Sequence, residues 1–341
     1  MSERASESAS TVRPRMRPTS DSEEGVMSER YALVTGASTG MGRATALRLA
    51  GDGYRVFAGV RKEADGEALA RDAAGNDGST SGGFGGVVPV LLDVTDAGQI
   101  AAAARTVTAR VGEAGLAALV NNAGVGVFGP LELASLEAIR WQFEVNVTGQ
   151  VAVTQAFLPL LRAARGRIVM IGSIGDRAAM PFGEPLGASK AAIALMADAL
   201  RQELAPWDVK VILIRPASIR TEAVDKFEAD AEKAIASFTD EGRALYAGTY
   251  RRMVTAALPR LRRGSSPDVV ANTVAAALAA PRPRTRYLAG KDSRRLATLS
   301  AVLPDRAFDA IRRRLFDLPA PGSLARESGQ KAEGATGAAI R

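Results

Sequence analysis

Three glycines that follow a short apolar stretch near the start of the chain could together hold an anion. Gly36, Gly40 and Gly42 come directly after residues 31–34, and residues 43–50 continue with helical spacing. At a helix N-terminus, unpaired N–H groups and the positive end of the helix dipole attract negative charge. Gly36 permits a tight turn, and the other two glycines let a pyrophosphate and the helix approach the strand closely. This strand–turn–helix pattern predicts dinucleotide binding.

Two residue types that often carry catalysis are missing. The chain has no histidine, which removes the usual general base, the serine–histidine triad and most transition-metal sites. It has no cysteine, which excludes disulfides, thiol nucleophiles and thiolate metal ligands. We therefore expect no metal site.

The chain is basic, with a formal net charge of +7 and a pI of about 10.0. Its arginines gather late in the chain without interleaved aromatic residues, so we expect a solvated basic surface and no nucleic-acid partner. No apolar run reaches the ~18 residues of a membrane-spanning helix, and residues 1–30 lack the apolar core of a secretory signal. We expect a cytoplasmic protein.

Strand-like and helical segments alternate along the next two hundred residues or so. After residues 31–34, the expected strands are 55–60, 87–92, 116–120, 167–171 and 209–214. The expected helices are 62–73, 97–111 with Asp96 as its N-cap, 133–141, 151–161 and 187–204. Repeated units of this length predict an α/β fold, a doubly wound parallel sheet with helices on both faces and ligands at the carboxyl ends of its strands.

This alternation breaks after Thr221. Residues 222–258 are charged and helical, and we interpret them as an insertion in a single Rossmann-type domain that covers residues 30–318. A helix at 267–280, a short strand at 286–288 and one or two helices at 294–316 complete the expected domain. Residues 1–29 have the composition of a disordered tail, and residues 319–341 that of a mobile one.

Several separate motifs together make residues 31–288 resemble the short-chain dehydrogenase/reductase family. The loop Thr35-Gly36-x-x-x-Gly40-x-Gly42 resembles its cofactor loop, and Asp93-Val94 stands where an acidic side chain meets the adenine. Asn121-Asn122-Ala123-Gly124 matches the segment that lines the cofactor. Pro216-Ala217-Ser218-Ile219-Arg220-Thr221 is similar to the loop that holds the nicotinamide carboxamide, with Ala217 where glycine is usual.

The resemblance implies a nicotinamide cofactor and a set of residues that contact it. Those expected from the matching motifs and from the end of the second strand are Gly36, Ser38, Thr39, Gly40, Met41, Gly42, Arg61, Asp93, Val94, Asn122, Ala123, Gly124, Lys190, Pro216, Ala217, Ile219 and Thr221. Arg61 bears on the choice of cofactor. An NAD enzyme of this type has a carboxylate near the end of the second strand for the ribose 2′-hydroxyl, whereas Val60 is followed here by Arg61 and Lys62. Their positive charge suits a 2′-phosphate and favours NADP(H) over NAD(H).

The family's catalytic residues are a serine, a tyrosine thirteen residues later and a lysine four residues after that, with an asparagine of the proton relay upstream. Asn146, Ser173 and Lys190 match the asparagine, serine and lysine, but Leu186 stands in the place of the tyrosine. In the family, that tyrosine exchanges a proton with the substrate oxygen, the lysine lowers its pKa and the serine orients the oxygen. Leucine can neither donate nor accept a proton.

Two functions from different classes follow. The first is an oxidoreductase that transfers hydride between NADP(H) and a carbonyl or alcohol, with a water, Lys190 or a residue of the insertion handling the proton. The second is a catalytically weak or inactive protein that binds NADP(H) and acts as a sensor or partner-binding module.

The substrate and the assembly are less constrained by the sequence. Bulky residues in 222–258 are similar to the lid of the steroid and retinol dehydrogenase branches and suggest a large apolar ketone or alcohol, although they can equally pack the insertion onto the body. The helices at 151–161 and 187–204 match those through which relatives dimerise, so we expect a homodimer or homotetramer.

Overall fold

The computed structural model describes residues 29–75 and 86–324, and its centre is a parallel sheet of seven strands. The strand order is β3-β2-β1-β4-β5-β6-β7. The direction of the chain along the sheet reverses after β3, which is the doubly wound arrangement predicted from the sequence. The strands are β1 (Arg30–Val34), β2 (Tyr54–Val60), β3 (Gly86–Leu91), β4 (Ala118–Asn121), β5 (Arg167–Ile171), β6 (Lys210–Pro216) and β7 (Arg286–Ala289).

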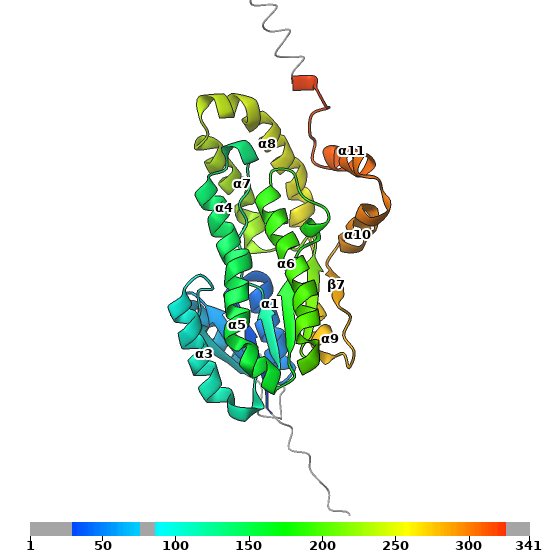
Figure 1. Ribbon diagram of the computed structural model, residues 1–341. Helices are drawn as coiled ribbons and strands as arrows, with labels where there is room; N and C mark the ends of the chain where they lie inside the picture. The colour runs from blue at the N-terminus through cyan, green and yellow to red at the C-terminus, as the bar shows by residue number, and fades with distance from the viewer. Residues whose placement is uncertain (1–28, 76–85, 325–341) are drawn as a thin grey trace, which may run out of the picture.

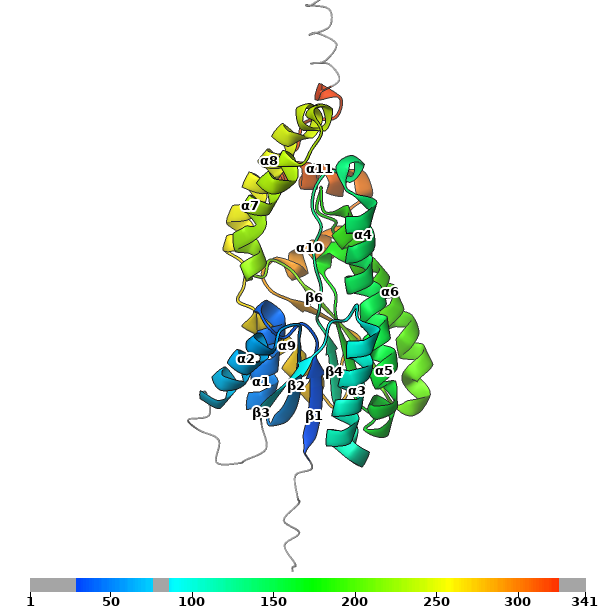
Figure 2. The same cartoon turned by 90° about the vertical axis from the view of Figure 1, so that its left-hand side faces the viewer.

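Helices cover both faces of this sheet (Figure 2). On one face lie α1 (Gly40–Gly51), α2 (Glu63–Gly75) and α9 (Asp268–Ala279), and on the other α3 (Ala97–Val111), α5 (Gly149–Ala163) and α6 (Glu184–Leu204). Each face has its own apolar core, with Phe57 and Phe157 fully buried on the α3–α6 side and Leu49 on the α1–α9 side. Strands buried on both faces are continuously apolar, which is why the sequence pattern reveals them.

A third apolar cluster lies away from the sheet, around α7 (Glu222–Ala236) and α8 (Asp240–Arg262). These two helices form the insertion and extend beyond the carboxyl ends of the strands (Figure 1). They rest on two loops of the body through aromatic contacts. The rings of Phe128 and Phe227 are 5.1 Å apart, and those of Phe182 and Tyr250 are 5.4 Å apart. Phe227 and Tyr250 therefore pack the insertion onto the body, whereas Leu245 is exposed.

The remaining helices complete the end of the molecule where the carboxyl ends of the strands lie. Helix α4 (Leu136–Phe143) continues through a π-helical turn, η3 (Glu144–Thr148), into α5. After β7 the chain forms α10 (Ser293–Val302) and α11 (Asp305–Leu315), separated near Pro304 as expected. Within the described ranges, no helix is both long and apolar enough to cross a membrane.

The predicted fold class is confirmed, and the element boundaries differ by a few residues. Strand β4 starts two residues later than expected, and α5 and α6 start earlier. Asp96 caps α3 as predicted, because its carboxylate accepts hydrogen bonds from the backbone of Gly98 and Gln99. Nearly all of the predicted N-terminal tail, most of the predicted C-terminal tail and residues 76–85 lie outside the described residues.

Candidate active site

The glycine loop joins β1 to α1 and has the geometry that its spacing predicted. Gly36 and Gly40 have φ angles of +61° and +54°, a region that favours glycine. At Gly42 a Cβ atom would lie 2.1 Å from the carbonyl oxygen of Gly36. Any side chain at Gly42 would therefore push α1 away from the loop. The cradle left by these absent side chains fits a pyrophosphate at the α1 N-terminus.

Thr35 links the glycine loop to the segment that follows β4. Its Oγ1 accepts hydrogen bonds from the backbone N–H groups of Asn122 (2.9 Å) and Ala123 (3.0 Å). The Asn122 side chain in turn donates to the carbonyl oxygens of Thr35 (2.9 Å) and Gly36 (3.1 Å). The segment after β4 and the glycine loop are thus one hydrogen-bonded unit. Thr35 was not among the predicted site residues. Its position could have indicated a role in the site, because it is a polar residue directly after an apolar strand.

Two residues expected near the adenine follow β3. Val94 is buried, and Asp93 is half-buried at the edge of the sheet. Asp93 Oδ1 accepts hydrogen bonds from the backbone N–H (2.9 Å) and the hydroxyl (2.7 Å) of Thr95, so its carboxylate is held in one orientation. The Asp93 N–H donates to Gln99 Oε1 at 2.8 Å.

The end of β2 carries positive charge next to the glycine loop. The Ala37 N–H donates to the carbonyl oxygen of Gly59 at 2.9 Å, which fixes the strand end beside the loop. Arg61 and Lys62 come directly after β2, and both are exposed. A third cation close by, Arg43, already forms an ion pair with Asp72.

Residues 216–221, at the end of β6 and after it, are hydrogen-bonded to two distant parts of the chain, at Ser265 and Ala289. The Ala217 N–H donates to Ala289 O (2.9 Å), and Ser218 O accepts from the Ser265 N–H (2.7 Å). Ala217 stands where the resemblance expects glycine, yet the left-handed residue is its neighbour Ser218, with φ +49°. The substitution of glycine by Ala217 is therefore accommodated, and Ser218 takes the strained conformation.

Lys190 lies on α6, buried at the carboxyl end of β5. Its Nζ donates to the carbonyl oxygen of Ile171 at 2.8 Å, and only 8% of the residue is exposed. Burial lowers the pKa of Lys190 from 10.5 to about 8, because the charged form loses hydration. An ammonium group with such a pKa can give up a proton near neutral pH.

Ser173 is the N-cap of a short 3₁₀ turn, η4 (Ile174–Asp176), two residues after the end of β5. Its Oγ accepts a hydrogen bond from the Gly175 N–H at 2.9 Å. This bond uses a lone pair of the hydroxyl, so its proton can still be donated to a carbonyl oxygen. The turn packs against the first turn of α6, where Gly187 faces the carbonyl oxygen of Gly175.

Asn146 lies in the π-helical turn η3 and is fully buried. It exchanges two hydrogen bonds with the backbone of Val125, at 2.8 and 2.9 Å, and donates to Ser189 Oγ at 3.1 Å. Gly124 lies close to both Asn146 and Lys190, since a Cβ there would be 3.3 Å from Asn146 Oδ1 and 3.6 Å from Lys190 Nζ. Ser189 is a contact that the sequence motifs did not single out.

Leu186 occupies the first turn of α6 and is half-buried. Its Cδ2 lies near Gly126, and the ring of Phe128 lies against the same glycine. None of the five tyrosine hydroxyls is hydrogen-bonded to Ser173 or Lys190. Tyr246 donates to Glu132, Tyr250 packs on Phe182 with its pKa raised to about 12 by burial, and the others are on strands: Tyr31 (β1), Tyr54 (β2) and Tyr287 (β7).

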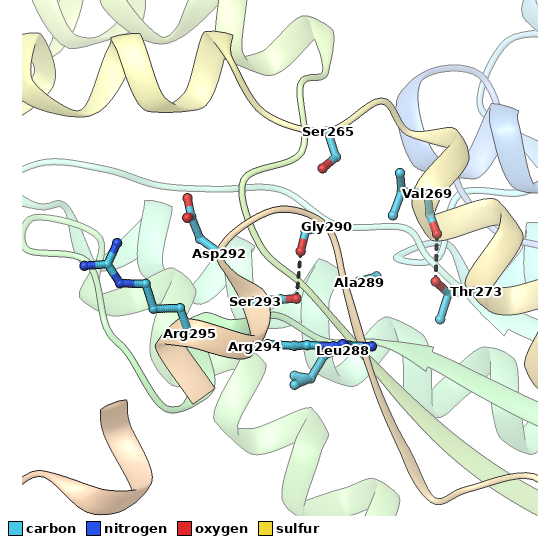
Figure 3. A pocket seen from close by; sticks show the side chains of 10 residues that line it. All are labelled: Ser265, Val269, Thr273, Leu288, Ala289, Gly290, Asp292, Ser293, Arg294 and Arg295. Atoms are coloured by element: carbon cyan, nitrogen blue, oxygen red, sulfur yellow. Dashed lines mark hydrogen bonds between the residues drawn. The ribbon is translucent and has the colours of Figure 1, made fainter. Parts of the chain in front are cut away.

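A cavity of about 460 Å³ lies beside β7 and the N-terminus of α10 (Figure 3). Its walls include Ser265, Thr273, Leu288 and Arg294, and none of the predicted site residues lines it. Ser265 and Gly290 separate this cavity from the 216–221 segment, which they support. This cavity is therefore separate from the predicted active site.

The buried ammonium of Lys190 should make the protein more stable at higher pH. Its folded pKa of about 8 lies below the unfolded value of 10.5, so between these values the unfolded chain binds the extra proton. The free energy of unfolding therefore rises with pH across this window, by at most about 3 kcal/mol. Urea denaturation at several pH values should show the rise, and Lys190→Met should remove it. Lys210→Met, at an exposed lysine, should keep it. An unchanged slope in Lys190→Met would contradict the assignment.

Comparison with known proteins agrees with this geometry. The family model of short chain dehydrogenases matches residues 30–232. Human short-chain dehydrogenase/reductase family 9C member 7 is 35% identical over 301 residues, 87% of this chain and 93% of that protein. Mouse retinol dehydrogenase 5 is 33% identical over 300 residues, 86% of this chain and 91% of that protein.

A solved structure of a metagenomic short-chain oxidoreductase in complex with NADP is also similar. It has a TM-score of 0.57 and 26% identity, and the match covers 76% of this chain and 96% of that one. The family model covers more than half of the present sequence, and the relatives match along almost their whole length. The chain belongs to the short-chain dehydrogenase/reductase family.

Proposed function

We propose that this protein is an oxidoreductase that transfers hydride between NADP(H) and the carbonyl or alcohol carbon of an apolar substrate. The observation that carries the proposal is the buried Lys190, bonded to Ile171 O at the end of β5, next to the Ser173 turn and the segment after β4. Burying an ammonium is costly, so a fold that keeps one here needs a reason beyond packing. Binding ribose hydroxyls and supplying positive charge at the reacting oxygen would be that reason.

Each side chain has a separate task in this reaction. When bound, NADPH supplies a hydride to the carbonyl carbon, and the carbonyl oxygen then needs a proton to become an alcohol. The Ser173 hydroxyl donates a hydrogen bond that orients this oxygen. Lys190 or a water beside it gives the proton, and a pKa of about 8 suits that transfer. Orientation alone supplies a large rate factor, whereas the missing acid is typically worth ~10²–10⁴-fold.

A second function is favoured by one specific observation, the leucine at position 186. With leucine in place of the tyrosine, the protein could bind NADP(H) without turnover and act as a sensor. Absorbance assays of NADPH oxidation with a panel of apolar ketones decide between the two. Oxidation that depends on ketone supports the enzyme, and saturable NADPH binding with no oxidation on any substrate supports the sensor.

We propose a large apolar substrate, as in the retinol and steroid branches of the family. The apolar cluster of α7 and α8 meets the body at Phe128 and Phe182, on the side of Leu186. A cavity of about 450 Å³ lies beside Phe182. Most of the side chains that line it are apolar, and the polar ones are Thr249 and Arg313. The name of the mouse relative, retinol dehydrogenase 5, points to the same kind of substrate.

NADPH should bind more tightly than NADH, and Arg61→Ala should remove most of this difference. The exposed guanidinium at the end of β2 would pair with the 2′-phosphate that only NADPH carries. Losing such a contact typically costs ~1.5–3 kcal/mol, or about ten- to a hundredfold in affinity. Fluorescence titration of both cofactors measures it, with Arg71→Ala on α2 as the control. Equal affinity for the two cofactors in the unmodified protein would rule out this preference.

Leu186→Tyr should create or raise ketone reduction. Position 186 is one helical turn before Lys190, so the ammonium group would lower the pKa of the new phenol. Leu186→Phe is the matched control, because it adds the ring without the hydroxyl. Overpacking against Gly126 and Phe128 can cost ~1–3 kcal/mol, which thermal denaturation of both variants would show.

The outcomes for position 186 are distinct. Activity that rises with tyrosine and not with phenylalanine means that the acid position is vacant and the rest of the site is intact. A tyrosine variant that folds, binds NADPH and reduces nothing new means that the site has lost its catalytic geometry. High activity in the unmodified protein that is lost in Leu186→Tyr means that leucine lines the substrate pocket.

We propose that two or four copies associate through α5 and α6. On α6, Leu195 is 73% exposed and Met196 is 40% exposed, and large exposed apolar side chains favour cover by a second copy. Leu195→Lys should shift the protein to monomers at micromolar concentration in sedimentation velocity. Leu131→Lys, at another exposed leucine, should leave the assembly unchanged. An unmodified protein that sediments as a monomer would contradict the proposal.

A further inference from the structure

One buried ion pair joins the Ser173 turn to the last residues of β6. The Arg215 guanidinium contacts Asp176 Oδ2 through Nε at 2.7 Å and Nη2 at 2.6 Å. The two side chains are only 10% and 3% exposed. Asp176 is the last residue of η4, three residues after Ser173, and Arg215 directly precedes Pro216 and the segment that follows β6.

Stability alone is a poor reason for such a pair. Taking two charges out of water costs about as much as their attraction returns, and apolar replacements are often equally stable. Asp176 is also incompletely satisfied, because its Oδ1 is buried without a partner in the described part of the chain. Arg215 therefore provides the contacts that keep this carboxylate in place.

The two partners differ in rigidity. Strand β6 pairs with β5 through five residues and with β7 through four, so Arg215 stands on a fixed frame. The η4 turn has only three residues, and its own hydrogen bonds are local, because Gly175 and Asp176 donate to Ser173. The Gly172 N–H, before the turn, donates to Ile214 O of β6 at 2.9 Å, so the Asp176–Arg215 pair is a second link to β6 at the other end of the turn. The parity of β6 places Arg215 with Val211 and Leu213 on the sheet face that α6 covers. Because Arg215 is fixed in the sheet, its ion pair with Asp176 restrains the η4 turn and Ser173 at the start of that turn.

We propose that Asp176 and Arg215 are positioning residues that fix the Ser173 turn against β6, so that the serine hydroxyl meets the substrate oxygen beside the cofactor. This rests on the proposed function, since it assigns Ser173 the substrate oxygen. The pair acts through Ser173 and contacts neither substrate nor cofactor. Cofactor binding depends on the glycine loop and on the segment after β6, whose backbone is anchored separately by Ser265 and Ala289.

The test compares the full-length protein with Asp176→Asn. The neutral amide keeps the size of the side chain and loses its charge, so the turn should move while β6 stays. The specificity constant for a ketone should fall about tenfold or more, mainly through kcat, because small misplacements of a catalytic group are costly. The Kd for NADPH should stay within about twofold. The double variant Asp176→Asn with Arg215→Gln, a neutral pair, should recover part of the loss.

Two controls keep the result interpretable. Asp52→Asn breaks an arginine–carboxylate pair on the exposed surface of α1 and should change neither constant. If Asp176→Asn does not fold, Asp176→Glu keeps the charge on a longer arm. It should fold and show the same loss in the specificity constant. An unchanged specificity constant in a folded variant, or an equal loss of NADPH affinity, would overturn the proposal.

A failure of the proposed function would look different. In that case the unmodified protein oxidises no NADPH with any ketone. Calorimetry of ketone binding to the NADPH-loaded protein then tests the pair. Asp176→Asn should weaken that binding about tenfold if Ser173 is displaced. Equal ketone affinity, or no ketone binding by the unmodified protein, would overturn the positioning role.

Discussion

A lysine ammonium group buried at the edge of a parallel sheet is the constraint on which the site depends. Lys190, on α6, donates to the carbonyl oxygen of Ile171, the last residue of β5, and three residues before it Gly187 lies close to the carbonyl oxygen of Gly175 in the Ser173 turn. The parallel strands bring their carboxyl ends to the same edge, so the glycine loop, the segment after β4 and the segment after β6 meet there. Each then needs a brace, and Thr35, Asn146 and Ser265 supply it through side-chain or backbone hydrogen bonds.

Much of the fold could be predicted from the sequence, because its physical causes are local. Strands buried on both faces are continuously apolar, and Asp96 caps α3 through its own neighbours. The need for glycine at position 42 also follows from the spacing of the motif, and the contact with Gly36 explains it. The class of the fold depends on many such signals that agree, and a shift of a few residues at a strand end does not change it.

What could not be predicted depends on contacts between distant parts of the chain. Asp176 and Arg215 are 39 residues apart, and no local pattern pairs them. The left-handed conformation of Ser218 is found in a segment against which Gly290 and Gly264, far along the chain, pack closely. Equally, the sequence left open what the bulky residues of the insertion do. Packing of Phe227 on Phe128 gives Phe227 a structural role, and the Phe128 ring also lies against Gly126, which is close to Leu186.

Leu186 stands where the family has its usual acid, so the proposed function requires that hydride transfer occurs without that phenol. The most direct measurement uses NADPH that carries deuterium at the transferring position of C4, with an apolar ketone and mass spectrometry of the product. We expect one deuterium on the carbinol carbon of the alcohol, formed at a rate that depends on the protein concentration. Tight NADPH binding with no labelled alcohol from any ketone would contradict it.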